Sequence, residues 1–93
     1  MKDSDDYPVL KPVEVAALKA LYAVAGSSLS AHPPIEAIQS KFKKDKRHLA
    51  RKAIKILCRM GYVNKHPTRG GMTYELTRMG KKFIEGMEHN KRD

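Results

Sequence analysis

Apolar residues recur at helical spacing in four stretches of the chain. In the first stretch they lie at three- and four-residue spacing, at Val13, Ala16, Ala17, Leu21 and Val24. Because Pro12 precedes them and Gly26 follows them, we predict an amphipathic helix between these two residues. The second stretch follows a short connector, residues 29–32, for which we predict a brief extended segment. This second stretch predicts a shorter helix that starts at Pro33-Pro34, with one apolar face formed by Ile35, Ile38 and Phe42.

The third stretch predicts a helix over residues 46–60. Its apolar positions follow the pattern of a buried face, with two further apolar residues beside them: Leu49, Ala53, Ile56, Leu57 and Met60, then Ala50 and Ile54. Asp45 is placed to cap the first turn by accepting a backbone hydrogen bond. Gly61 can adopt the left-handed conformation that commonly ends a helix.

Two β-favouring runs follow, at residues 62–66 and 72–76. Their alternating character and the Pro- and Gly-containing segment between them, residues 67–71, predict a β-hairpin. Thr77 can cap a final helix, whose inner face is formed by Met79, Phe83, Ile84 and Met87.

The order of these elements predicts an α+β fold. About three residues separate the second and third helices, which is the turn length of a helix-turn-helix motif. A hairpin directly after the third helix makes the unit a small winged helix-turn-helix domain, with a three-helix core, a β-hairpin wing and a C-terminal helix. We expect residues 11–88 to form this domain, residues 1–10 to be a flexible lead-in and residues 89–93 a flexible tail.

Length and composition narrow the class of protein. A chain of 93 residues fits one small domain. A single cysteine cannot form an intrachain disulfide, which points to a reducing compartment. No stretch is apolar enough for a membrane span, and the first residues lack the pattern of a secretory signal. These features predict a cytoplasmic protein with no membrane association.

The net charge of +9 is concentrated in the middle of the chain. Residues 41–71 hold eleven Lys and Arg residues against one acidic residue, Asp45. Three basic and five acidic residues precede them, and five basic and four acidic residues follow. Concentrated positive charge is typical of a nucleic-acid site, although a Lys-rich segment can also be an ordinary solvated helix face.

The outer face of the third helix argues for an anionic partner. It carries no acidic residue and consists of Arg47, His48, Arg51, Lys52, Lys55 and Arg59. A solvated face usually mixes both signs, because like charges four residues apart repel each other. In a helix-turn-helix protein the N-terminal half of this helix enters the major groove. We therefore expect the residues nearest base edges to be Lys46, Arg47, His48, Arg51 and Lys52.

Further cations are expected to contact the DNA backbone. Lys55 and Arg59, in the second half of the helix, are expected to face phosphates. The turn before the helix offers phosphate contacts from Lys41, Lys43 and Lys44. The wing offers Lys65, His66 and Arg69.

These residues resemble the winged helix-turn-helix families of bacterial and archaeal transcription regulators. The match covers about 40 residues and includes Leu57, Met60, Gly61, Tyr62, Val63, Tyr74, Leu76, Thr77 and Gly80. The resemblance implies double-stranded DNA as the partner, nucleoid association and a homodimer. Candidate dimer surfaces are the first helix, with Leu18 and Tyr22 exposed, and the last helix after Gly80. The same residues could instead complete the core of a monomer.

Two other functions stay open. Residues 48–54, the hairpin and Leu76-Thr77 also look somewhat like a winged-helix protein of the archaeal and eukaryotic small ribosomal subunit, so RNA is an alternative partner. A winged helix can also dock on proteins, although such modules often have a neutral or acidic third helix.

The sequence offers no pattern for catalysis or for a cofactor. The four histidines are 16 to 23 residues apart, and none forms a metal-binding pair with another histidine or with the single cysteine, Cys58. No phosphate-binding glycine loop precedes a helix, and no paired carboxylates are visible. We therefore expect a protein that is not an enzyme and that has neither a metal nor a cofactor.

Overall fold

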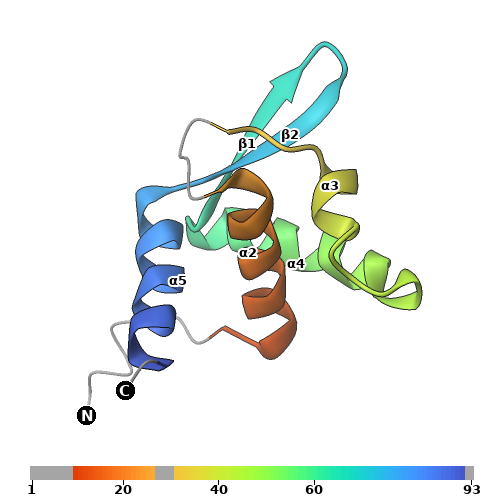
Figure 1. Ribbon diagram of the computed structural model, residues 1–93. Helices are drawn as coiled ribbons and strands as arrows, with labels where there is room; N and C mark the ends of the chain where they lie inside the picture. The colour runs from red at the N-terminus through yellow and green to blue at the C-terminus, as the bar shows by residue number, and fades with distance from the viewer. Residues whose placement is uncertain (1–9, 27–30, 92–93) are drawn as a thin grey trace.

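The computed structural model describes residues 10–26 and 31–91, with side chains described as far as residue 87. Within these ranges four α-helices, one 3-10 turn and a two-stranded antiparallel hairpin form an α+β fold. In chain order they are α2 (Pro12–Ala25), α3 (Ile35–Gln39), η1 (Lys44–Lys46), α4 (Arg47–Met60), β1 (Val63–Thr68), β2 (Gly71–Leu76) and α5 (Arg78–Lys91). The helices pack together, and the hairpin projects from one end of the molecule (Figure 1). Residues 1–9 of the predicted lead-in, 29–30 of the connector and 92–93 of the tail lie outside the described ranges.

Helix α2 begins and ends as predicted but buries a different face. The Glu14 carboxylate accepts a hydrogen bond from the backbone N–H of Lys11 at 2.9 Å, and Gly26 ends the helix with a φ of 63°. Leu18 is fully buried, so it completes the core of the monomer, which was the alternative to an exposed dimer surface. Ala16 is exposed, so the prediction that it faces inward is wrong. The middle of α2 is apolar on almost every side, and its pattern alone does not decide which side packs.

A 3-10 turn leads into α4. Asp45 lies inside η1, and the residue before α4 is Lys46, whose side chain makes no capping hydrogen bond. The prediction that Asp45 caps this helix is therefore wrong, because a residue inside such a turn lacks the extended backbone that a cap needs. Instead, the Gln39 side-chain amide donates to the backbone carbonyl of Arg47 at 2.9 Å. This bond joins α3 to the first residue of α4.

Helix α4 packs through Ala50, Ala53, Ile54 and Leu57. Ile56 was predicted to be buried, but it is 38% exposed, so that prediction is wrong. The buried face is centred on those four residues, two of which are alanines, and α4 packs against α2. Gly61 then ends the helix in the left-handed conformation, as predicted.

The hairpin forms where predicted but has a shorter turn. The strands pair in antiparallel register from Val63 opposite Leu76 to Thr68 opposite Gly71. The turn therefore comprises residues 69–70 instead of 67–71. Gly71 has a φ of 134°, a backbone conformation that favours glycine.

The connector before α3 runs beside strand β2. The Tyr74 N–H donates to the carbonyl of Pro33 at 2.9 Å, and Pro34 forms an isolated bridge with Thr73. The backbone of the connector therefore pairs with β2 at Pro33 and Pro34, just after residues 29–32, for which the extended segment was predicted. These contacts hold the connector against the hairpin.

Helix α5 is capped by Thr77 as predicted. The Thr77 hydroxyl oxygen accepts a hydrogen bond from the Gly80 N–H at 3.0 Å and donates to the Gly61 carbonyl at 2.7 Å. Gly80 is buried at a point where a Cβ atom would collide with the backbone carbonyl of Tyr62. Met79 was predicted to face inward but is 44% exposed, because its neighbour Gly80 makes the close contact. The helix continues past residue 88, the predicted end of the domain.

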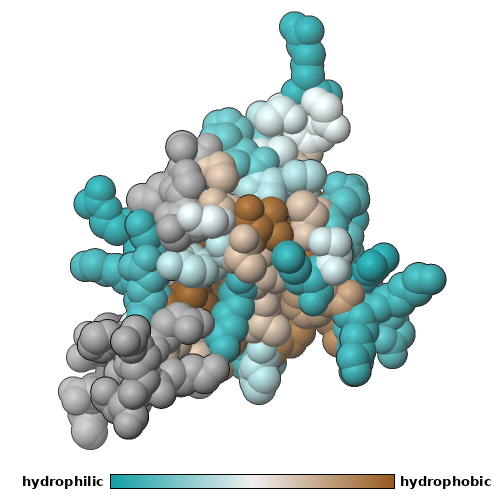
Figure 2. All heavy atoms as spheres, viewed as in Figure 1, coloured by the Kyte–Doolittle hydropathy of each residue, from teal (hydrophilic) through white to brown (hydrophobic). Residues whose placement is uncertain are grey.

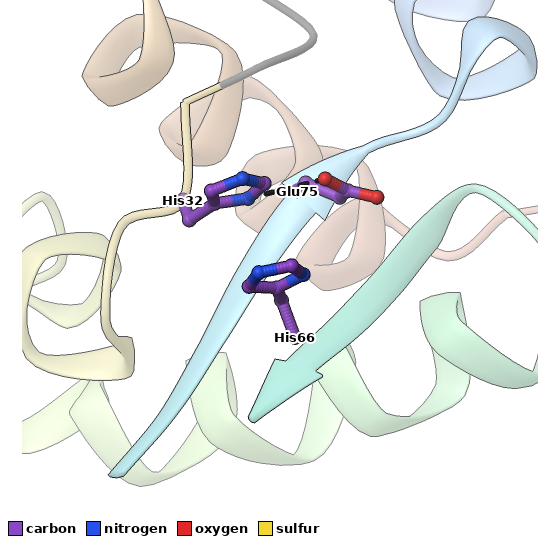
Figure 3. A group of neighbouring side chains, drawn as sticks. All are labelled: His32, His66 and Glu75. Atoms are coloured by element: carbon purple, nitrogen blue, oxygen red, sulfur yellow. Dashed lines mark ion pairs between the residues drawn. The ribbon is translucent and has the colours of Figure 1, made fainter. Parts of the chain in front are cut away.

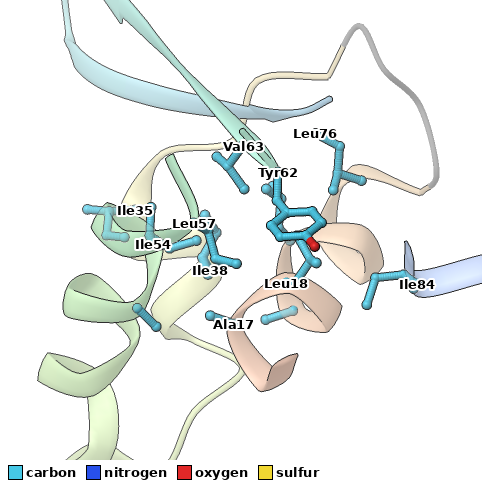
Figure 4. Close-up of a cluster of buried hydrophobic side chains, with 13 residues drawn as sticks. Ala17, Leu18, Ile35, Ile38, Ile54, Leu57, Tyr62, Val63, Leu76 and Ile84 are labelled. Carbon is cyan, nitrogen blue, oxygen red and sulfur yellow. The ribbon is translucent and has the colours of Figure 1, made fainter. Parts of the chain in front are cut away.

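A single apolar cluster joins the helices to the base of the hairpin (Figure 4). Its largest fully buried side chains are Leu18, Leu21, Ile38, Ile54, Leu57, Val63 and Ile84. On the face seen in Figure 2, long hydrophilic side chains extend from the edges around a central group of apolar residues. None of the helices in the described ranges has the length and apolar character needed to cross a bilayer.

Candidate nucleic-acid interface

The outward side of α4 carries the basic residues predicted for DNA contact. All of them are exposed: Arg47, His48, Arg51, Lys52, Lys55 and Arg59. They face solvent because the opposite side of the helix packs into the core. Four of these cations follow each other at four-residue intervals, so they form one row along the helix. We call this set of six residues the α4 basic face.

No carboxylate neutralises the α4 basic face in the described part of the chain. The ion pair found among the described side chains joins His32 to Glu75, and neither residue belongs to α4. Like charges four residues apart on a helix cost about 0.2–0.5 kcal/mol for each pair. The helix therefore presents positive charge that the described side chains do not offset.

The turn before α4 extends this positive surface. Lys41, Lys43, Lys44 and Lys46 are all exposed. The first turn of α4 contains no acidic residue. Cations near the N-terminal end of a helix are unfavourable, because the helix dipole is positive there, whereas an anion is favourable. The start of α4 is thus suited to an external anion.

Lys65 continues the basic surface onto the hairpin. A recess between the second half of α4 and β1 is lined by Lys55, Arg59 and Lys65, together with Cys58, Val63 and Asn64. Burial raises the pKa of the Cys58 thiol above its ordinary value, although nearby Lys65 acts in the opposite direction. The thiol therefore stays protonated at neutral pH and does not offset the three positive charges.

A second recess lies between α3, α4 and the hairpin. Arg51 and Tyr74 both line it, and Glu36 is the acidic residue among its lining side chains. Burial raises the pKa of the Tyr74 hydroxyl; Cys58 and Glu36 add to this effect and Arg51 opposes it. The hydroxyl is thus neutral at physiological pH and can donate a hydrogen bond.

The structure separates the three residues predicted for the wing. Lys65 lines the recess beside α4, and Arg69 is exposed in the turn at the tip. Because neighbouring residues of a strand point to opposite faces, His66 lies on the other face of the hairpin. There its ring stacks on that of His32, with centroids 4.0 Å apart and planes 2° from parallel (Figure 3).

Sequence reasoning missed the cluster of His32, His66 and Glu75. The His32 Nδ1 atom lies 3.1 Å from Glu75 Oε1. The histidines are 16 to 23 residues apart along the chain, and this spacing does not indicate which of them meet in space. With the correct hairpin register, in which Asn64 lies opposite Glu75, the sequence would have placed His66 and Glu75 on one face. No sequence signal brings His32 to the same place.

Comparison with known proteins assigns no family. No family model matches the chain, and no curated protein matches it. The function is therefore argued from the arrangement of residues described above.

Proposed function

We propose that the protein is a winged-helix protein that binds double-stranded DNA, and that it acts as a small transcription regulator on the nucleoid in the cytoplasm. The α4 basic face carries this proposal, because its cations are exposed and no described carboxylate pairs with them. DNA has one negative charge per about 1.7 Å of its axis, and its major groove admits an α-helix. The α4 basic face therefore suits a duplex in shape and in charge.

The first half of α4 is the part that reads bases in this proposal. Arg47 and Arg51 can each make a bidentate contact with guanine, which discriminates against other bases by about 1–3 kcal/mol. His48 and Lys52 lie beside them. Because α4 contains no Asn or Gln to read adenine, we expect strong general affinity and modest sequence preference.

The remaining cations hold the DNA backbone. Lys55, Arg59 and Lys65 surround one recess, which is suited to a phosphate group. The lysines of the turn contact phosphates next to the start of α4, and Arg69 does so from the tip of the hairpin, which serves as the wing. The resemblance to regulators also predicts a homodimer. Leu18 is fully buried, and Tyr22 is half-buried with its hydroxyl donating to the Glu85 carboxylate at 3.1 Å, so the exposed side of α5 is the better candidate for that contact.

A salt titration tests this function. The protein is titrated against a mixed-sequence duplex of about 25 base pairs and against a structured RNA of equal charge, with fluorescence anisotropy as the readout. If roughly six to eight cations contact phosphates, the logarithm of the affinity for the duplex should fall with the logarithm of salt concentration at a slope of about −5 to −7. We expect tighter binding to the duplex than to RNA.

Two other results would contradict the proposal, and each would indicate a different function. Preference for the RNA would indicate an RNA- or ribosome-binding protein that uses the same basic face. Binding to neither nucleic acid would indicate a domain that docks on proteins.

A further inference from the structure

Three side chains with metal-binding atoms meet on the face of the hairpin away from α4. His66 comes from β1, Glu75 from β2 and His32 from the connector before α3 (Figure 3). One possible ligand atom from each residue lies within 4.8 Å of the other two. We propose that these residues form a binding site for a divalent transition-metal ion of the Zn²⁺ type. This proposal does not depend on nucleic-acid binding.

The donor set determines the class of ion. Two imidazole nitrogens and one carboxylate oxygen suit Zn²⁺ and similar metals, whereas Ca²⁺ and Mg²⁺ prefer sites made of oxygen ligands alone. Three protein ligands leave a fourth position of a tetrahedral site for water. The His32 and Glu75 side chains are 32% and 24% exposed, so an ion and its water can reach them from solvent.

Small side-chain movements are enough to complete the site. Ligand bonds to Zn²⁺ of about 2.0–2.2 Å require tetrahedral donor atoms to be roughly 3.4 Å apart. The His32 and Glu75 atoms are already 3.1 Å apart. The two stacked rings need to tilt so that a nitrogen of each points at the same ion, and both histidines are exposed enough to do so.

The backbone around the cluster is held independently of any ion. The hydrogen bond from the Tyr74 N–H to Pro33 fixes the connector beside β2. The Thr73 hydroxyl donates to the backbone carbonyl of His66 at 2.6 Å. The Asn64 amide lies 3.5 Å from the second oxygen of Glu75, where it can orient the carboxylate. An ion bound here would link the connector to both strands and restrict the movement of the hairpin.

Metal affinity tests the proposal directly. The full chain, without a histidine tag, is titrated with Zn²⁺ in competition with a chromophoric chelator, and Co²⁺ absorption reports the coordination. We expect one ion per chain. His32→Ala, His66→Ala and Glu75→Gln should each weaken Zn²⁺ binding by at least about tenfold, since even changes around a ligand cost roughly 10- to 100-fold. Ca²⁺ should not compete.

His48→Ala is the matched control, because it removes an exposed histidine from α4 and leaves the cluster intact. It should bind Zn²⁺ as the unaltered chain does, and circular dichroism should show that every variant is folded. The proposal is overturned if the unaltered chain does not bind Zn²⁺, or if folded cluster variants bind it equally well. The ion pair and the ring stack would then serve only to attach the connector to the hairpin.

Discussion

Replacement of both Arg47 and Arg51 with glutamate should weaken binding to duplex DNA by about 100-fold or more at moderate salt. Each arginine is expected to make a hydrogen bond to the DNA in which one partner is charged, and such bonds contribute about 1.5–3 kcal/mol each. Their combined loss corresponds to at least two orders of magnitude in affinity, and repulsion from phosphates increases it.

The matched control is the Arg78→Glu/Lys82→Glu double variant. These two residues are exposed on α5 with the same four-residue separation, and their replacement changes the net charge by the same amount. Because the exposed side of α5 is also the candidate dimer contact, sedimentation first checks that both variants keep the oligomeric state of the unaltered chain. Anisotropy titrations of both variants against the same duplex then separate a specific contact from a general charge effect. Equal losses in the two variants would mean that α4 has no special role.

Leu18→Ala should lower the free energy of unfolding by about 2–5 kcal/mol, whereas Ile56→Ala should change it by only about 0.5 kcal/mol. Leu18 is 0% exposed and contacts the core, so its truncation leaves a cavity. Ile56 is 38% exposed on α4 and leaves no cavity. From the pattern of apolar residues, Leu18 was a candidate for exposure and Ile56 was expected to be buried.

Urea denaturation followed by circular dichroism measures both effects. The two variants are matched, because each shortens a large aliphatic side chain to alanine within a helix. A larger loss for Ile56→Ala would show that the helices pack by the faces that the sequence pattern suggested. An unchanged stability of Leu18→Ala would place that residue on the surface, where it could serve a dimer.

Local signals in the sequence predicted most elements well. The exception is the second helix, which ends at Gln39, before Phe42, so that residues 40–46 separate it from α4 instead of about three residues. Gly26 and Gly61 end their helices in the left-handed conformation, and Thr77 caps the last one, because these features depend on the nearest few residues. The side on which each helix packs depends instead on the partner helix. In α2, apolar residues surround almost the whole helix, so several faces were compatible with burial. In α4, the basic residues left one side to pack, and Ile56 at the edge of that side was misplaced.

The part of the candidate interface that lies on a single helix, α4, was predictable from the sequence. The cations of α4 share a face because of helical periodicity, and the structure exposes all of them. The histidine cluster was not predictable, because it depends on the exact register of the hairpin and on the path of a connector. His66 was assigned to the DNA-binding wing, and nothing in the sequence indicates that its ring stacks on that of His32.

A map of the DNA-binding surface shows whether α4 contacts the duplex. Backbone amide chemical shifts are recorded by NMR while an unlabelled duplex of about 25 base pairs is added. We expect the largest changes at residues 41–59 and along β1, and small changes on α5. Changes confined to α2 or α5, or no changes at all, would contradict the proposal that α4 binds DNA.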